Sequence, residues 1–120
     1  MQIPLQITFR HMVTSVAADE AIREHVDYLE QFFDNVTGCR VVIDAPPAHR
    51  TKGGPFSVHL DLTVPGREIF VSTERDHRET HSDLYIALRD AFDAAKRQLD
   101  GHAQRQRGEL KNHSSPRAEL

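Results

Sequence analysis

The chain has 120 residues, which is the length of one domain. Its 15 Lys and Arg residues against 18 Asp and Glu residues give a formal net charge of −3, so a general coating of nucleic acid is not implied. The sequence has a single cysteine, which excludes an internal disulfide and a zinc site built from several cysteines. We expect no membrane span and no secretory leader, and we predict a cytoplasmic protein.

Charge is unevenly distributed along the chain. Residues 10–34 contain two basic and six acidic side chains, whereas residues 84–111 contain six basic and four acidic ones. We therefore predict that an electrostatic contact surface lies in the C-terminal half. The alternative is a solvated helix face of mixed charge, which is a common arrangement.

The chain is predicted to begin with a strand and a helix. Residues 5–10 alternate between apolar and polar side chains, as in a half-buried strand. The helix is capped by Thr14 or Ser15, because short side-chain oxygens accept hydrogen bonds from the free amides of a first turn. Asn35 and Gly38 are expected to end it. Its apolar stripe consists of Ile22, Val26, Leu29 and Phe33.

Three further strands are expected, at residues 39–43, 58–64 and 69–73. Pro65 and Gly66 fit the centre of a tight turn between the last two, because proline presets φ and glycine supplies a positive φ. A loop rich in proline and glycine precedes this pair of strands, and a polar loop rich in histidine follows it.

A second helix is expected next, capped by Ser82 or Asp83. Gly101 is predicted to end or interrupt this helix, and the composition beyond it becomes polar and aperiodic. We therefore divide the chain into a domain at residues 1–107 and a flexible C-terminal tail or linker at residues 108–120. The apolar stripe of the second helix consists of Leu84, Leu88, Ala91, Phe92, Ala95 and Leu99.

The predicted element order is β-α-β-β-β-α, which is an α+β fold. Three successive strands favour hairpins, and two amphipathic helices each need an apolar surface to cover. One four-stranded sheet with two helices packed on one face satisfies both needs and leaves the opposite face open to solvent.

No motif for catalysis stands out. The sequence lacks the G-x-S-x-G motif of serine nucleophiles and the lysine-hydroxyl ending of a phosphate-binding loop. Cys39 is interpreted as a structural thiol. His77 and His81 have a spacing that binds zinc on a helix, but a third ligand would have to come from His49 or His59. We therefore predict a protein that is not an enzyme and needs no metal and no cofactor.

Several segments match a known family. Residues 21–26 (AIREHV) and 29–34 (LEQFFD) resemble the first helix of the ribosome hibernation promoting factors, also called protein Y or ribosome-associated inhibitor A. Residues 83–88 (DLYIAL) and 97–99 (RQL) resemble the second helix of that family. Residues 59–74 are similar to its last hairpin.

The resemblance covers residues 5 to about 107 and agrees with the element order predicted above. It implies a cytoplasmic, stress-phase factor that binds the small ribosomal subunit between head and body. There such factors occupy the channel for messenger and transfer RNA near the decoding centre, block initiation and protect idle ribosomes. They are not enzymes, they need no cofactor, and their basic residues contact phosphates of ribosomal RNA. We expect no DNA, membrane or small-molecule partner, and a monomer when the protein is free.

Basic residues on the second helix and its extension are the predicted RNA contacts. At 100° per residue, Arg89, Lys96 and Arg107 fall within a limited arc, and Arg97, which the family match supports best, lies about one step away. Arginine suits this role because its planar fork can hold a phosphate through two hydrogen bonds. The predicted RNA-binding residues are Arg89, Lys96, Arg97, Arg105, Arg107 and, on the first helix, Arg23.

The sequence departs from the family pattern in three places. Its first helix is about one turn shorter and carries acids such as Asp27 where the family has lysines. The loop before the second helix is longer and rich in histidine. The long form's C-terminal dimerisation domain has no counterpart, and the tail resembles the linker of relatives that carry a cold-shock domain. The net charge of −3 keeps a second interpretation open, a non-ribosomal regulatory module that binds another protein through the open sheet face or through the acidic first helix.

Overall fold

The structure, a computed structural model, describes residues 3–46, 55–73 and 83–114, with only the helical backbone described from 105 to 114. The elements follow in the order β1 (Leu5–Arg10), α1 (Val16–Phe32), β2 (Gly38–Asp44), β3 (Ser57–Val64), β4 (Arg67–Ser72) and α2 (Leu84–Ser114). The predicted β-α-β-β-β-α order is therefore confirmed.

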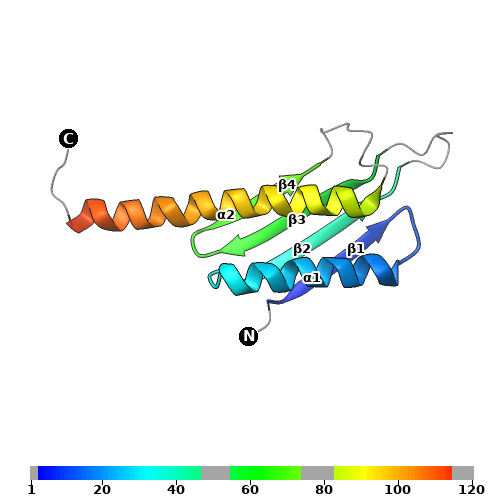
Figure 1. Cartoon of the computed structure of the whole chain (residues 1–120), viewed down its shortest axis with the longest axis horizontal. Coiled ribbons are helices and arrows are strands. Elements are labelled where there is room, and N and C mark those ends of the chain that lie inside the picture. Colours follow the sequence, from blue (N-terminus) through cyan, green and yellow to red (C-terminus); the bar gives the residue numbers. More distant parts are fainter. Residues whose placement is uncertain (1–2, 47–54, 74–82, 115–120) are drawn as a thin grey trace.

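The four strands form one mixed sheet whose spatial order, β1-β2-β3-β4, is also their order in the chain. β1 and β2 are parallel, because α1 carries the chain back to the end of the sheet where β1 began. β2, β3 and β4 are antiparallel neighbours. Gly66, with a φ of +86°, lies in the turn between β3 and β4 as predicted. Figure 1 shows both helices side by side on one face of this sheet.

The core lies between the sheet and the two helices. Val58, Leu60 and Leu62 of β3 are fully buried, whereas His59 and Asp61 between them lie on the open face and are partly exposed. The predicted helix stripes are largely confirmed. Among the described side chains, the buried residues of the two helices are Ala18, Ile22, Val26 and Leu29 in α1, and Ala87, Leu88, Ala91, Phe92, Ala95, Leu99 and His102 in α2.

Each helix begins at a side chain that accepts a backbone hydrogen bond. The Oγ of Ser15, rather than that of Thr14, accepts from the amide of Ala18 at 3.1 Å. At the start of α2 the carboxylate of Asp83 accepts from the amide of Tyr85 at 2.9 Å. Both contacts satisfy amides that have no partner within the first turn of a helix.

The predicted ends of both helices need correction. α1 ends at Phe32, before Asn35, and Gly38 is the first residue of β2. Gly101 does not end α2, because the helix continues through it to Ser114. A single glycine weakens a helix by only about 1 kcal/mol relative to alanine, so the flanking turns can override it.

The 31 residues of α2 correspond to a length of about 46 Å. His102 is the last buried residue among the described side chains, and beyond it the helix extends past the sheet (Figure 1). The division into a domain at 1–107 and a tail at 108–120 stays a prediction, and the helical backbone crosses it. No helix within the described ranges is both long and apolar enough to cross a membrane.

Candidate nucleic-acid interface

A groove of about 530 Å³ lies between the two helices. One wall is aromatic and belongs to the C-terminal end of α1, and the other wall is charged and belongs to α2. The lining residues are Tyr28, Phe32, Phe33, Asp93, Lys96, Arg97 and Asp100.

The aromatic wall consists mainly of Tyr28 and Phe32. Their side chains are 46% and 61% exposed, and their ring centroids are 4.6 Å apart with a tilt of 45° between the planes. Sequence analysis did not single out either residue. The signal that could have found them is a pair of aromatic residues four positions apart, which places them on the same side of α1 but outside its buried stripe.

The charged wall brings together two of the predicted RNA-binding residues, Lys96 and Arg97. The Nζ of Lys96 lies 4.7 Å from the centroid of the Tyr28 ring, in a cation–π contact, and 3.3 Å from Oδ1 of Asp93. Arg97 is exposed and makes no ion pair with a carboxylate in the described part of the chain. Its guanidinium is therefore open to a ligand that approaches the helix side of the molecule.

Arg89 lies on the same face of α2 as Lys96, two turns earlier, because seven residues rotate a helix by nearly two full turns. Its Nη2 is 3.2 Å from Oδ1 of the neighbouring Asp90. Exposed ion pairs of this kind contribute at most about 1 kcal/mol, so Arg89 can exchange this partner for a phosphate at small cost.

Arg23 does not belong to the groove. Five residues separate it from Tyr28, a rotation of about 140° on α1, which turns it away from α2. Its Nε is also 2.6 Å from Oδ1 of Asp19, one turn earlier.

Arg105 and Arg107 belong to α2, but their side chains lie outside the described residues. Of the six predicted RNA-binding residues, the structure therefore places Lys96 and Arg97 at one groove and Arg89 on the same helix, and it separates Arg23 from them.

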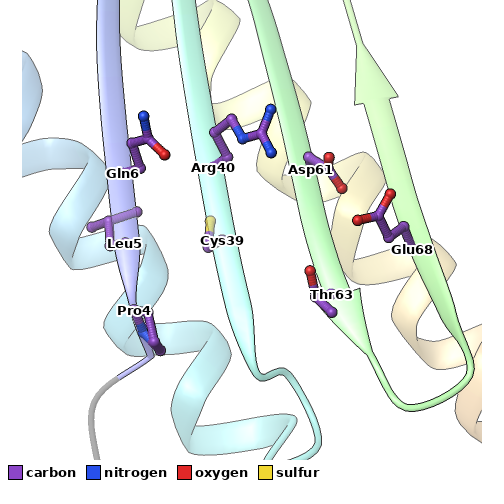
Figure 2. Close-up of a pocket in the computed structure, with 8 residues that line it drawn as sticks. All are labelled: Pro4, Leu5, Gln6, Cys39, Arg40, Asp61, Thr63 and Glu68. Atoms are coloured by element: carbon purple, nitrogen blue, oxygen red, sulfur yellow. The ribbon is translucent and has the colours of Figure 1, made fainter.

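The open face of the sheet has a different charge pattern. Figure 2 shows a pocket of about 250 Å³ on this face, where Arg40 of β2 extends toward Asp61 of β3 and Glu68 of β4 lies beyond. Arg40 and Asp61 are directly opposite in the β2–β3 register. Two carboxylates against one guanidinium disfavour an anionic phosphate. The helix side is therefore the better candidate for a contact with nucleic acid.

Cys39 lies at the edge of this pocket and is buried. Burial, reinforced by the negative charge of Asp61, raises the pKa of the Cys39 thiol to about 12. The thiol is therefore protonated at neutral pH and is a poor nucleophile, which agrees with the structural role predicted from the sequence.

Within the described ranges no three His, Cys, Asp or Glu side chains are grouped so that they could hold a metal ion. His49, His77 and His81 lie outside those ranges, and His59 lies on the open face of β3.

Comparisons with known proteins agree with this architecture. A family model described as "Sigma 54 modulation protein / S30EA ribosomal protein" matches residues 5–107. A ribosome hibernation promoting factor from Acinetobacter guillouiae is 31% identical over 108 residues, which are 85% of this chain and 90% of that protein.

Two solved structures share the fold at lower identity. A ribosomal subunit interface protein from Coxiella burnetii is 16% identical, with a TM-score of 0.68 over 85% of this chain and 99% of that chain. The N-terminal domain of Thermus thermophilus protein Y is 17% identical, with a TM-score of 0.57 over 82% of this chain and 96% of that chain. Because the family model spans nearly the whole described fold, the chain belongs to the Sigma 54 modulation protein / S30EA ribosomal protein family.

Proposed function

We propose that this chain binds the small ribosomal subunit in the channel for messenger and transfer RNA and blocks translation there under stress. Membership in the family implies ribosome-associated translation inhibition and places the chain among non-enzymatic ribosome-binding proteins. The choice of subunit, the channel, a cytoplasmic site of action and a monomeric free state are parts of the proposal.

The observation that carries the proposal is the position of Arg97. It lies in a segment that resembles the family's second helix, it is exposed beside Lys96, and it has no ion pair among the described carboxylates. A guanidinium in this position can hold a phosphate through two hydrogen bonds. Such a contact reads no bases, so binding is largely independent of RNA sequence and weakens as salt rises.

The remaining basic residues extend this contact along α2. We propose that Arg89, Lys96, Arg105 and Arg107 bind neighbouring phosphates, whereas Arg23 contributes at the periphery because it faces away from α2. The contact follows one helix, as expected for a protein that lies along a phosphate backbone.

Charge reversal tests the proposal. We expect the triple variant R97E, R105E and R107E to fold normally but to lose co-sedimentation with small subunits in a sucrose gradient. Its inhibition of translation in a cell-free system is expected to fall in parallel. The matched control for Arg97→Glu alone is Arg10→Glu, because Arg10 is also exposed and lies at the end of β1, where the alternation with Phe9 places it on the open face of the sheet, away from the helices.

Two outcomes would contradict the proposal in different ways. If the triple variant binds with unchanged affinity and salt dependence, the RNA contact lies elsewhere, and Arg50 and Lys52, outside the described residues, become the next candidates. If the wild-type protein stays in the top fractions of the gradient, a protein-interaction module that uses the open sheet face or the acidic α1 becomes the better interpretation.

A further inference from the structure

We propose that the groove between α1 and α2 binds a single unpaired nucleotide of RNA, with its base stacked on the Phe32 ring beside Tyr28 and its phosphate held by Arg97. The inference rests on the proposed function and adds to it a base-binding site, which phosphate contacts alone do not require.

The two rings are the first observation. More than half of Phe32 and nearly half of Tyr28 are exposed to solvent. Unpaired bases stack on exposed aromatic side chains whatever their identity, because every base has a π-face. Lys96 already lies over the Tyr28 ring, so the more exposed Phe32 ring offers the larger free face.

The charges of the groove are the second observation. Lys96 pairs with Asp93, which leaves the guanidinium of Arg97 and the carboxylate of Asp100 in the lining as a cation and a hydrogen-bond acceptor. A nucleotide fits this arrangement better than a lone phosphate, because it can use both groups. Its phosphate can bind Arg97, while its base or ribose can donate a hydrogen bond to Asp100, which has no ion pair among the described residues.

The size of the groove agrees with this occupant. A volume of about 530 Å³ lies within the usual range for small-ligand sites, roughly 300–1,000 Å³, and accommodates one nucleoside. The groove lies on the same side of the molecule as the proposed phosphate contacts. An RNA strand held by α2 would therefore bring its bases to this wall.

The open sheet face provides a matched comparison. Phe70 on β4 is 61% exposed, the same fraction as Phe32, and its ring lies near His59 at 6.3 Å. The cross-strand partner of Phe70 is Asp61, and Glu68 lies two residues away on the same face. A phosphate next to a base on Phe70 would meet these carboxylates, so we place the base at the helix groove.

The test uses two probes with the same number of phosphates, a six-nucleotide single-stranded RNA and an abasic oligomer of equal length. We expect the wild-type protein to bind the RNA more tightly than the abasic oligomer. The double variant Y28L and F32L is expected to lose about five- to hundredfold in affinity for the RNA and nothing for the abasic oligomer, with an unchanged salt dependence. Phe70→Leu serves as the control and is expected to bind both probes as the wild type does.

Intrinsic fluorescence gives a second readout. The chain has no tryptophan and two tyrosines, so Tyr85→Phe leaves Tyr28 as the only strong emitter. Stacking of a base is expected to quench this emission, and the abasic oligomer is expected to leave it unchanged. Circular dichroism and urea unfolding establish that each variant is folded.

The inference is overturned if the wild type does not distinguish the two probes, if the double variant binds the RNA as tightly as the wild type, or if Phe70→Leu carries the loss instead. These results are separable from a failure of the proposed function. If the double variant binds RNA normally while Arg97→Glu no longer binds ribosomes, only the proposed base-binding site is contradicted. If the wild type never co-sediments with ribosomes, the proposed function itself is contradicted.

Discussion

Phe92 links the two helices at the centre of the core. Its side chain is 2% exposed, and its ring stacks on that of His25 from α1, with centroids 4.6 Å apart and an angle of 7° between the planes. The parallel stacking of these two rings sets how closely α1 and α2 approach each other at this position. The groove between α1 and α2 depends on that distance, so this residue in the core supports the candidate interface.

Removing the Phe92 ring is expected to be costly. Phe92→Ala should lower the free energy of unfolding by about 3–5 kcal/mol, because it removes buried surface and leaves a cavity. Urea unfolding measures this directly. Phe70→Ala is the control, since its ring is 61% exposed and its loss should cost less than about 1 kcal/mol. Equal losses in the two variants would show that Phe92 does not pack as described.

His25 gives stability a dependence on pH. Burial lowers its pKa from the ordinary value of 6.5, and Lys96 lowers it further, against the opposing effects of Asp93 and Glu24. The folded protein therefore resists protonation of this ring, whereas the unfolded chain takes up the proton near pH 6.5.

The sign of the effect follows from this difference. As pH falls from about 7.5 through 6.5 toward the lowered pKa of the folded state, His25 makes the protein progressively less stable. We expect the variant H25Q to show a shallower fall in the free energy of unfolding than the wild type, measured in urea at several pH values. The difference between the two curves isolates His25 from the other seven histidines. Parallel curves would contradict the prediction.

At the scale of the elements, the caps decide where the helices begin. Ser15 caps α1, whereas the adjacent Thr14 is exposed and is not the cap. Ser15→Ala should therefore lower the free energy of unfolding by about 1 kcal/mol, and Thr14→Ala should change it by less than half of that. Denaturant midpoints of the two variants provide the measurement. A larger loss for Thr14→Ala would reverse the assignment of the cap.

Elements in which apolar and polar residues recur with a regular spacing were predictable from the sequence. The alternation of Val58, Leu60 and Leu62 identified β3, because a strand with one buried face has only one register that hides its apolar side chains. Helix ends were less predictable. Gly101 is a sequence signal for an end, but a single weak residue cannot interrupt a helix whose neighbouring turns are intact.

The candidate site was predictable only in part. The sequence predicted that the basic residues of α2 lie in one band along the helix. Lys96 and Arg97 lie together at the groove, as this prediction requires. The aromatic pair has a recognisable spacing in the sequence, but its contact with Lys96 could not be predicted, because the meeting of Tyr28 with Lys96 depends on how α1 and α2 pack, and no local pattern encodes that packing. The position of Arg23, on the side of α1 that faces away from α2, also depends on how the two helices pack.

At the scale of the whole molecule, the two faces are chemically different. The open face of the sheet places Asp61 and Glu68 beside Arg40, whereas the helix face offers Arg97 beside two exposed aromatic rings. A polyanion is therefore expected to approach from the helix side. The orientation of the protein on its partner follows from this asymmetry.

The whole fold is also predicted to be independent of metal. His77 and His81 have no third histidine and no cysteine nearby in the sequence, and both lie outside the described residues. The melting temperature is expected to be the same with and without a chelator, and elemental analysis of protein purified without added metal should find no stoichiometric zinc. A large fall in melting temperature on chelation, together with bound zinc, would contradict the prediction.

The identity of chain order and sheet order has a consequence for folding kinetics. Every strand pairs with the strand that precedes or follows it, and the β1–β2 pairing, with Leu5 opposite Cys39, is the one that has to close across a helix. Because the other two pairings join consecutive antiparallel strands, we expect folding on the order of milliseconds rather than seconds. During synthesis the sheet can grow one strand at a time from β1, each new strand meeting a partner that is already made. The apolar surface of β3 and β4 stays uncovered until α2 has been made and has packed onto it.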